Sequence, residues 1–545
     1  MRSLLFIVGL LCLNTTCAQD FTAQDTLRGS ITPERAWWDV QHYELDVSVN
    51  PENKFISGST TMTYLVISDS RKMQIDLQPP MKLTKVVQNN KELNIEHNGN
   101  AHFIQLHNKQ ELQQEYTITF YFEGHPKEAV RAPWDGGFSW KKDSDGIDFI
   151  ATSCQGLGAS VWWPNKDHSY DEPNNGIDIS VTVPKKLTAV ANGRLLGTTE
   201  NNTTTTFHWQ VVNPINNYGV NINIGNYMHF GETYNGLKGV LDMDYWVLKQ
   251  NETKARAQFK DATRMMEAFE YWFGPYPFYE DSFKLVEVPY LGMEHQSSVT
   301  YGNQFKNGYL GTDLSDSGWG LKFDFIIIHE SGHEWFANNI TFIDAADMWV
   351  HEGFTAYSES LFVDYFYGTA AANAYVQGVR KRILNDSPII GTYGVNAPGS
   401  GDMYYKGSNM LHTLRQLVDD DTLWRNILNG LNKEFYHQTV SSAQVEAYIS
   451  KKTNKNLTAF FNQYLRTTNI PTLEYTVQNN EVWVKYSDTV PNFDMPLKIL
   501  LGDESKWVYP TQTWKNSGIS TTQNSIAIDP NFYVNLVQKT AIKID

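Results

Sequence analysis

Cysteine is almost absent from this sequence. Three cysteines occur in 545 residues, and two of them, Cys12 and Cys17, lie in an N-terminal segment that we expect to be removed. Cys154 is then left without a partner, so no disulfide can form within the chain and packing alone must hold the fold. For an exported protein, this absence favours a bacterial over an animal source.

Positive charge is also scarce. The chain has 44 Lys and Arg residues against 60 Asp and Glu residues, which gives a formal net charge of −16. Nucleic-acid binding requires a positive surface, and no cluster of Lys and Arg supplies one. We therefore expect no nucleic-acid partner.

Long apolar runs are missing too, apart from one short stretch at residues 4–13. That stretch follows Arg2 and precedes the small residue Ala18, which is the pattern of a secretory signal peptide cleaved after Ala18. It is too short to span a membrane, and no later run approaches membrane length. We expect a signal peptide over residues 1–18, a secreted or periplasmic mature protein and no transmembrane segment.

The chain is longer than one typical domain, and its first half reads as β-sheet. Residues 43–49, 116–122 and 177–183 alternate apolar and polar side chains, and turn-rich stretches separate them. Period-two alternation of this kind is typical of strands. We predict an antiparallel β domain over residues 19–231.

Helical periodicity replaces this alternation further along the chain. Residues 254–273 place apolar side chains three and four apart, which predicts one helix with an apolar face. We predict an α-rich domain over residues 232–468, with further helical segments near 371–386, 408–435, 441–450 and 457–466.

The pattern changes once more after Pro471, where only short strand-like segments occur. They predict a small β-sandwich over residues 469–545. The expected fold class is therefore multidomain α+β.

The stretch from Phe323 to Thr341 contains His329, Glu330 and His333, which form the pattern H-E-x-x-H. On a helix, two residues four apart share one face about 6 Å apart along the axis, so both imidazoles can bind one metal ion. Glu330 would project beside that metal, where its carboxylate could take a proton from water. Because a pattern of three fixed residues also arises by chance, the interpretation depends on finding the rest of a site.

Two histidines leave a zinc ion one short of the three protein ligands usual in a catalytic site. Glu352 is the expected third ligand, because it begins an apolar-faced helix that must pack inward. His351 is adjacent and competes with it, and spacing alone does not exclude that choice. Glu359, two turns further on, could orient a ligand imidazole through its other ring nitrogen.

Together these residues resemble the gluzincin zinc aminopeptidases of the aminopeptidase N and leukotriene hydrolase type, as a secreted bacterial member. Beyond the zinc motif, four segments match the family's motifs in the family's order. They are 290–296 (G-x-M-E-N, with His295 in place of Asn), 333–341 (H-Q-W-F-G-N-L-V-T), 402–407 (Y-x-K-G), and 152–155 with 170–173 (T-Q-x-Q/E and D-E-P). The resemblance implies a thermolysin-like catalytic domain over 232–468 that holds one zinc ion per chain.

The resemblance also implies a role for each matched side chain. Glu294, assisted by Gln155, would bind the free α-ammonium of a peptide. Glu330 would deprotonate water and later protonate the leaving amine. Tyr404 would stabilise the oxyanion, with Tyr405 as the alternative.

The backbone of Gly292 and Met293 would pair with an extended peptide substrate. His295 is larger than the family's Asn and ionisable near neutral pH, so we expect it to alter pH dependence or binding near the amine.

The predicted function is zinc-dependent removal of the N-terminal residue from peptides that have a free N-terminus. Two alternatives stay open: a zinc endopeptidase on the same scaffold, which would not need Glu294, and a catalytically inactive relative that binds a partner. A bifunctional epoxide hydrolase fits less well, because residues 396–403 match that enzyme poorly. No motif specifies the preferred N-terminal side chain or the oligomeric state.

Overall fold

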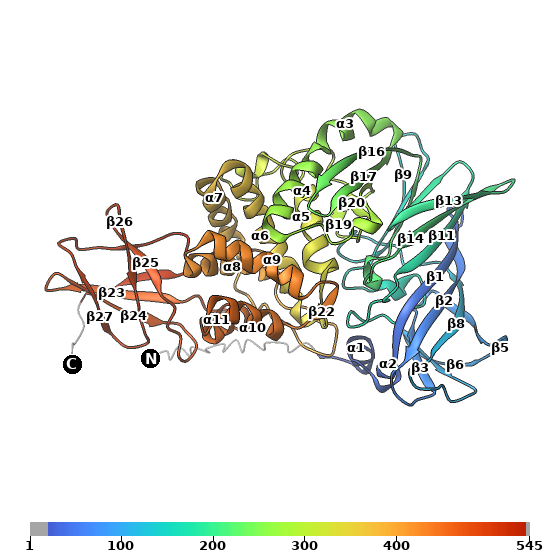
Figure 1. Cartoon of the computed structure of the whole chain (residues 1–545), viewed down its shortest axis with the longest axis horizontal. Coiled ribbons are helices and arrows are strands. Elements are labelled where there is room, and N and C mark those ends of the chain that lie inside the picture. Colours follow the sequence, from blue (N-terminus) through green and yellow to red (C-terminus); the bar gives the residue numbers. More distant parts are fainter. Residues whose placement is uncertain (1–19, 541–545) are drawn as a thin grey trace, which may run out of the picture.

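The computed structural model describes residues 20–540. Figure 1 shows a β-rich part at one end, a helical part in the middle and a small β part at the other end. The expected signal peptide, with Cys12 and Cys17, lies outside the described residues and stays a prediction. Within residues 20–540, no helix combines the length and apolar character needed to cross a membrane.

The N-terminal part is built on an eight-stranded sheet in the order β13-β14-β11-β1-β2-β8-β4-β5. Strand β11 alternates buried and half-buried residues along its whole length, as the sequence predicts. The strands are β1 (Trp38–Asn50), β2 (Phe55–Val66), β4 (Lys82–Gln88), β5 (Lys91–Glu92), β8 (Glu115–Gly124), β11 (Ile177–Pro184), β13 (Arg194–Glu200) and β14 (Thr204–Val211).

One pair in this sheet corrects the prediction of a purely antiparallel domain. Strands β1 and β11 run parallel, with Tyr43 opposite Ile177. Parallel neighbours need a long crossover connection, and here more than a hundred residues separate the two strands. The alternation of apolar and polar residues along a strand is the same in parallel and antiparallel pairs, so the sequence does not reveal that β1 and β11 are parallel.

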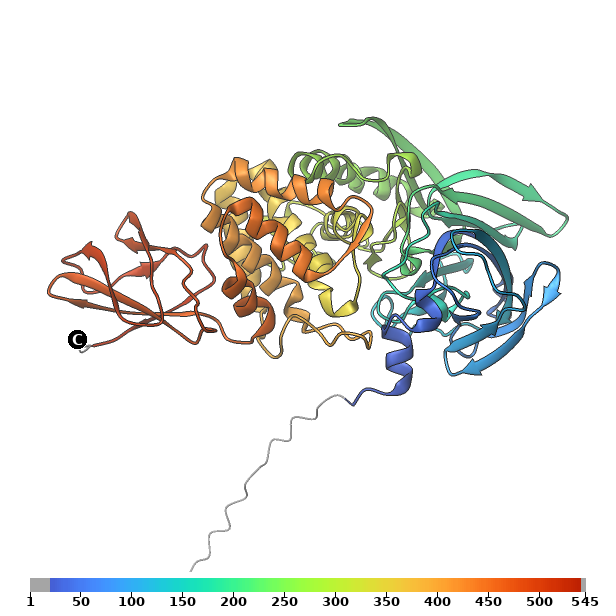
Figure 2. The same cartoon turned by 60° about the horizontal axis from the view of Figure 1, so that its bottom comes forward.

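Two smaller sheets and two short helices complete the N-terminal part. Figure 2 shows α1 at the junction with the helical part, and a Cβ on Gly29 would lie 2.0 Å from the backbone nitrogen of Asn396. The elements are α1 (Ala23–Gly29), α2 (Pro33–Ala36), β3 (Lys72–Asp76), β6 (Asn94–Asn98), β7 (Ala101–Gln105), β9 (Gly137–Lys142), β10 (Asp148–Ser153), β12 (Thr188–Ala191) and β15 (Ile222–Gly225).

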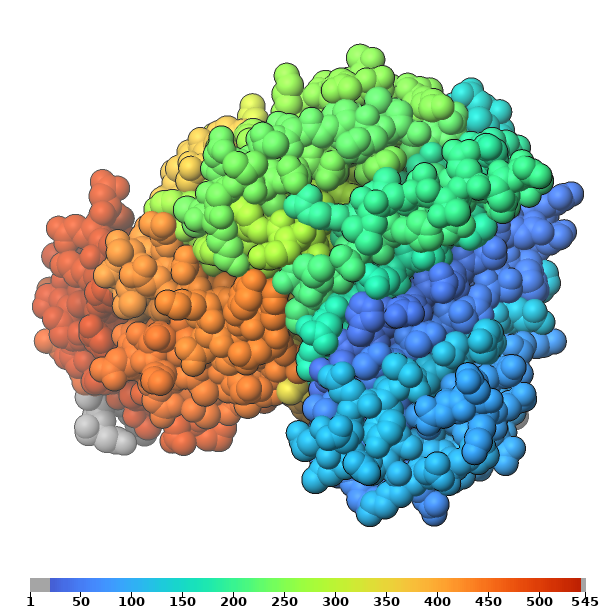
Figure 3. All heavy atoms as spheres, turned by 45° about the vertical axis from the view of Figure 1, so that its right-hand side comes forward, coloured from blue at the N-terminus to red at the C-terminus, as the bar shows by residue number. Residues whose placement is uncertain are grey.

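The middle part of the chain, which we call the catalytic part after the domain predicted there, begins with a five-stranded sheet in the order β16-β17-β18-β20-β19. Its strands are β16 (Tyr227–Gly236), β17 (Gly239–Leu248), β18 (Phe283–Glu287), β19 (Gly292–Met293) and β20 (Val299–Tyr301). The expected boundary after residue 231 falls inside β16, which pairs with β17 from end to end, so the division lies before Tyr227. In Figure 3 the teal and green residues of the N-terminal part adjoin the residues that follow in the chain.

The helices differ from the predicted segments mainly where they break. The segment 254–273 is two helices that meet at Phe259, and 408–435 is divided near Asp419, which has the left-handed φ of 53°. The segment predicted to run to 386 ends its α-helix at Val379. The helices are α3 (Glu252–Gln258), α4 (Lys260–Phe273), α5 (Phe325–Gly332), α6 (Trp349–Tyr367), α7 (Thr369–Val379), α8 (Tyr405–Val418), α9 (Asp421–Glu434), α10 (Ser442–Thr453) and α11 (Thr458–Arg466).

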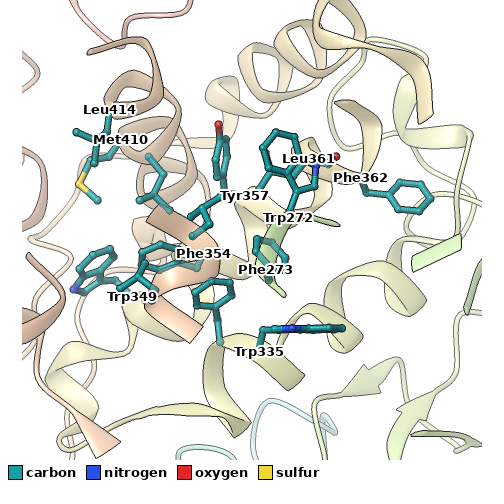
Figure 4. Packing of buried hydrophobic residues seen from close by; sticks show 14 of the residues in the cluster. Trp272, Phe273, Trp335, Trp349, Phe354, Tyr357, Leu361, Phe362, Met410 and Leu414 are labelled. Atoms are coloured by element: carbon teal, nitrogen blue, oxygen red, sulfur yellow. Dashed lines mark hydrogen bonds between the residues drawn. The ribbon is translucent and has the colours of Figure 1, made fainter. Parts of the chain in front are cut away.

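Helix α6 lies at the centre of the helical part. Figure 4 shows its apolar side chains between those of α4 on one side and those of α8 on the other. Phe354 also stacks on Phe336 with ring centroids 4.6 Å apart. Residues 349–363 of α6 are all buried, the polar ones included, so the polar residues at the start of the helix lie inside the protein.

The chain ends in two small sheets whose inner faces share one buried core, as the predicted β-sandwich requires. Helix α11 ends at Arg466 and strand β23 begins at Thr472, and the domain boundary at residue 469 stays a prediction. The strands are β23 (Thr472–Gln478), β24 (Glu481–Ser487), β25 (Leu497–Leu501), β26 (Glu504–Val508), β27 (Lys515–Ser520), β28 (Ala527–Ile528) and β29 (Asn535–Gln538); a separate parallel pair, β21 (Ile340–Phe342) and β22 (Gln438–Val440), lies in the helical part.

Candidate active site

Helix α5 carries the H-E-x-x-H pattern, and it is short. The Asp324 carboxylate caps its start by accepting hydrogen bonds from the backbone N–H groups of Ile326 and Ile327, at 3.1 and 3.4 Å. The helix ends at Gly332, and His333 is its C-terminal cap with φ −65° and ψ −18°. The second histidine therefore lies at the end of the helix, because the chain leaves helical geometry at Phe336.

His329, His333 and Glu352 come together as a buried group. The Nε2 atoms of His333 and His329 lie 3.3 and 3.7 Å from Oε2 of Glu352. One ligand atom from each residue lies within 4.8 Å of the others. Within residues 20–540, that Glu352 oxygen has no hydrogen-bond partner. A buried carboxylate oxygen beside two imidazole nitrogens is the donor set that zinc prefers, so these residues fit the metal.

His351, the competing ligand, is excluded by its position. Its Nε2 accepts a hydrogen bond of 2.9 Å from the backbone N–H of Phe342, and its ring stacks on the Phe342 ring with centroids 4.2 Å apart. The imidazole is therefore already engaged on another side of α6. Glu352 remains as the candidate for the third ligand.

The other ring nitrogens of both histidines face hydrogen-bond acceptors. Nδ1 of His329 lies 2.7 Å from Oε1 of Glu359, whose second oxygen accepts a hydrogen bond from the Tyr375 hydroxyl at 2.6 Å. Nδ1 of His333 lies 3.0 Å from the carbonyl oxygen of Phe336. These partners place the protons on Nδ1 and leave both Nε2 atoms free to bind a metal. The orienting role predicted for Glu359 agrees with this geometry.

Two glycines let the helices approach closely enough to assemble this group. A Cβ on Gly332 would lie 2.6 Å from Oγ of Ser358, so α5 and α6 meet there. A Cβ on Gly407 would lie 3.0 Å from Cα of Gly353, so α6 and α8 meet at a glycine pair. This second crossing brings Tyr404, at the start of α8, beside the histidines.

Tyr404 is positioned as a hydrogen-bond donor. Its ring stacks beside His329 with centroids 6.0 Å apart. Burial, with the Glu352 carboxylate, raises the pKa of Tyr404 well above its usual value, so the phenol keeps its proton. Burial also raises the pKa of Glu330, and the Glu294 carboxylate adds to that shift while His329 opposes it. A carboxylate with a raised pKa is suited to accept and return a proton near neutral pH.

Glu294 and Gln155 meet although they come from different parts of the chain. Nε2 of Gln155 donates to Oε1 of Glu294 at 2.6 Å and to Oε1 of Glu352 at 3.1 Å. Gln155 follows β10 of the N-terminal part, whereas Glu294 follows β19 of the catalytic part. The site therefore needs both parts.

Two residues to which the sequence analysis gave no role, Asn338 and Glu334, bind the backbone of the segment that carries Glu294. Nδ2 of Asn338 donates to the backbone carbonyl of Glu294 at 2.9 Å, and Oε1 of Glu334 accepts from the backbone N–H of Ser297 at the same distance. Glu334 follows His333 directly, and Asn338 lies five residues after it. The segment after the metal-binding helix thus fixes the segment that carries Glu294.

His295 does not take part in the site in the way expected from its replacement of Asn. Its imidazole is fully buried, with Nδ1 3.3 Å from the Thr300 hydroxyl, and it does not line the cavity. Burial lowers the pKa of His295 to about 3, so the ring stays neutral near neutral pH. A neutral His295 does not favour the expected change in pH dependence, and its effect on binding near the amine stays a prediction.

All predicted site residues face one cavity of about 360 Å³. Gly292 is required in its wall, because a Cβ there would lie 2.6 Å from Cγ2 of Ile326. The predicted residues in the wall are Gln155, Gly292, Met293, Glu294, His329, Glu330, His333, Glu352, Glu359, Tyr404 and Tyr405; those not predicted are Pro133, Trp134, Gly156, Leu291, Tyr309, Phe325, Ile326, Met348 and Pro398.

Comparison with known families gives two matches. Residues 257–464 match the peptidase family M1 domain, and residues 39–218 match the peptidase M1 N-terminal domain. Among solved structures, the M1 zinc metallopeptidase from Deinococcus radiodurans is 20% identical with a TM-score of 0.66, over 80% of this chain and 94% of that one. A mutant of that protein bound to a Tyr-Ser-Ala substrate gives 20% identity and a TM-score of 0.67, over 81% of this chain and 98% of the other.

Curated relatives are aminopeptidases of greater length. Endoplasmic reticulum aminopeptidase 1 of Mus musculus is 26% identical over 190 residues, which is 33% of this chain and 20% of that protein. Human aminopeptidase N is 26% identical over 182 residues, or 30% and 18% of the two chains. The leucyl aminopeptidase of Saccharolobus solfataricus is 19% identical over 347 residues, or 61% and 43%. The matches thus span less than half the length of these relatives.

Proposed function

Because this chain belongs to the peptidase M1 family, we propose that it is a zinc-dependent aminopeptidase that removes the N-terminal residue from peptides. One observation carries the proposal: the Glu294 carboxylate, held by Gln155, faces the same cavity as His329, His333 and Glu352. Recognition of a free α-ammonium requires a carboxylate at a fixed distance from the metal. The aminopeptidase names of the relatives support the same reading.

The reaction divides between the metal and the side chains of this chain. His329, His333 and Glu352 would hold the zinc ion, which would supply Lewis-acid chemistry to the site. The Glu330 carboxylate accepts the proton of the attacking water and gives it to the departing amine. The Tyr404 phenol donates a hydrogen bond to the carbonyl oxygen as it becomes negative, and one such donor stabilises the transition state by about 3 kcal/mol.

The substrate backbone has a place beside β19. Strand β19 is the last strand of its sheet and pairs with β20 along one side, with Gly292 opposite Tyr301 and Met293 opposite Thr300. An extended peptide that pairs with the other edge would lie along the cavity wall. Its amine would then be at Glu294 and its first carbonyl at the metal-binding group.

Replacing Glu294 tests the aminopeptidase assignment. We expect Glu294→Gln to lower kcat/KM for leucyl-coumarin about a hundredfold, because the buried ammonium loses its charged partner. Zinc content should stay at one per chain, since Glu294 is not a ligand. The wild-type protein should leave N-acetyl-leucyl-coumarin uncut. Cleavage of the acetylated substrate at the rate of the free one would instead establish the endopeptidase.

We also propose that the protein is exported. Arg2, the apolar residues 4–13 and Ala18 support a cleaved signal peptide. N-terminal sequencing of protein recovered from outside the cytoplasm should begin at Gln19. A sequence that begins at Met1 would contradict export by this segment.

A further inference from the structure

Under the proposed function we divide the cavity wall into two ends, one next to His329 and one at the pair Gln155 and Glu294. At one end the rings of Tyr309 and Phe325 lie 5.5 Å apart, and Phe325 stacks on His329 with centroids 5.2 Å apart. The other, which we call the Gln155 end, combines residues of the N-terminal part with residues of the catalytic part. Its members are Pro133, Trp134, Gln155, Gly156, Met293, Glu294, Met348 and Pro398.

The Gln155 end is where the first residue of a peptide must lie under the proposed function. Its ammonium would pair with Glu294, which Gln155 holds at 2.6 Å. Its carbonyl would lie at the metal-binding group, so the peptide continues toward Phe325. The first side chain, attached between ammonium and carbonyl, therefore projects among the residues of the Gln155 end.

Trp134 is conspicuous among these residues because most of its surface is exposed. It is 67% exposed, on a loop over residues 129–136 whose Val130 is 86% exposed. Large apolar side chains left in water on an ordered loop often mark a binding surface.

The loop holds Trp134 in position without burying it. The Asp135 carboxylate accepts hydrogen bonds from the backbone N–H groups of Val130 and Arg131, at 2.7 and 2.9 Å. The backbone N–H of Trp134 donates to the carbonyl of Arg131 at 3.0 Å. Gly136 lies against Leu157, so the loop packs directly on the segment that carries Gln155.

We propose that Trp134 forms the outer wall of the pocket for the first side chain of the substrate, and that this pocket selects bulky apolar side chains such as Leu, Met and Phe. The inference rests on the proposed function and adds its substrate class. Trp134 supplies a flat apolar surface, and the flexible thioethers of Met293 and Met348 adapt to side chains of different shape.

The distribution of charge in the pocket also favours an apolar first side chain. Among the described residues of the Gln155 end, Glu294 is the one ionisable side chain, and the substrate ammonium takes it. A neighbouring cavity of about 40 Å³ contains Arg28 and Asp167, but these pair with each other at 3.3 Å. A Lys or Glu side chain of a substrate would therefore be buried without a charged partner, which is costly.

The test is a panel of aminoacyl-coumarins (Leu, Met, Phe, Ala, Lys, Glu) with the full-length zinc protein. We expect kcat/KM for Leu, Met and Phe to exceed that for Ala about tenfold and that for Lys and Glu about a hundredfold. Trp134→Ala should lower kcat/KM for Leu and Phe about tenfold and leave Ala within about twofold, because alanine does not reach the outer wall. Trp134→Phe should restore most of the loss.

Val130→Ala is the matched control, because Val130 is exposed on the same loop and does not line the cavity. It should leave the whole panel unchanged. An equal loss on every substrate in Trp134→Ala, or a wild-type preference for Lys or Glu, would overturn this inference and leave the aminopeptidase intact. No turnover of any free-amine substrate would overturn the proposed function, and this inference with it.

Discussion

Glu330→Gln is expected to lower kcat about 10⁴-fold while one zinc per chain remains bound. Glutamine fills the same space but cannot accept the proton of the attacking water, and a general base contributes up to about 10⁴ in rate. Glu330 lines the cavity but is not one of the three ligands that we assign, His329, His333 and Glu352, so the metal site should survive. Initial rates with leucyl-coumarin measure kcat, and zinc analysis of the same sample measures the zinc bound per chain.

Glu334→Gln is the matched control for this change. Glu334 lies four residues further along and is also buried, and burial raises its pKa to about 8. Its carboxyl is therefore mostly protonated at neutral pH, so Gln resembles the native group and can still accept from the Ser297 N–H. We expect nearly full activity. A loss in Glu334→Gln as large as in Glu330→Gln would show that the effect is structural.

The metal-binding residues could be predicted from sequence because helical spacing determines their geometry. Residues four apart on a helix share a face, so His329 and His333 had to meet. Glu352 was a predictable candidate because it begins a helix with an apolar face, which had to pack inward, and residues 349–363 of that helix are buried. Tyr404, Gln155 and Glu294 were identified only through motifs, since they lie far apart in the chain and no local pattern relates them.

The remaining features depend on contacts that local patterns do not encode. The apolar spacing of residues 254–273 continues through the break, because Phe259 is buried in the same core as the helices on either side. Trp134 lies in none of the matched motifs, and the motif over residues 333–341 contains Asn338 but does not indicate its contact with Glu294. Such positions become visible only when the two parts of the molecule are assembled.

Glu352→Ala is expected to abolish zinc retention and lower activity at least about 10³-fold. The change leaves two imidazoles, one fewer than the three protein ligands of a catalytic zinc site. It also removes a carboxylate oxygen that lies 3.7 and 3.3 Å from the Nε2 atoms of His329 and His333. Zinc analysis after gel filtration measures retention. A second measurement is the melting temperature with and without zinc, because a metal that binds only the folded state stabilises it. The wild-type protein should show a zinc-dependent shift and Glu352→Ala should not.

Two substitutions near Glu352 distinguish the loss of a zinc ligand from the loss of a residue close to the ligands. Glu359→Gln weakens the hydrogen bond that orients His329, so zinc affinity should fall about 10- to 100-fold and activity should return when zinc is added. His351→Ala removes an adjacent imidazole that faces Phe342, so it should keep its zinc. Zinc loss should therefore be largest in Glu352→Ala and smaller in Glu359→Gln, and His351→Ala should lose none. If His351→Ala lost zinc and Glu352→Ala kept it, the ligand assignment would be wrong, because the side chain turned toward Phe342 would then be the one that binds the metal.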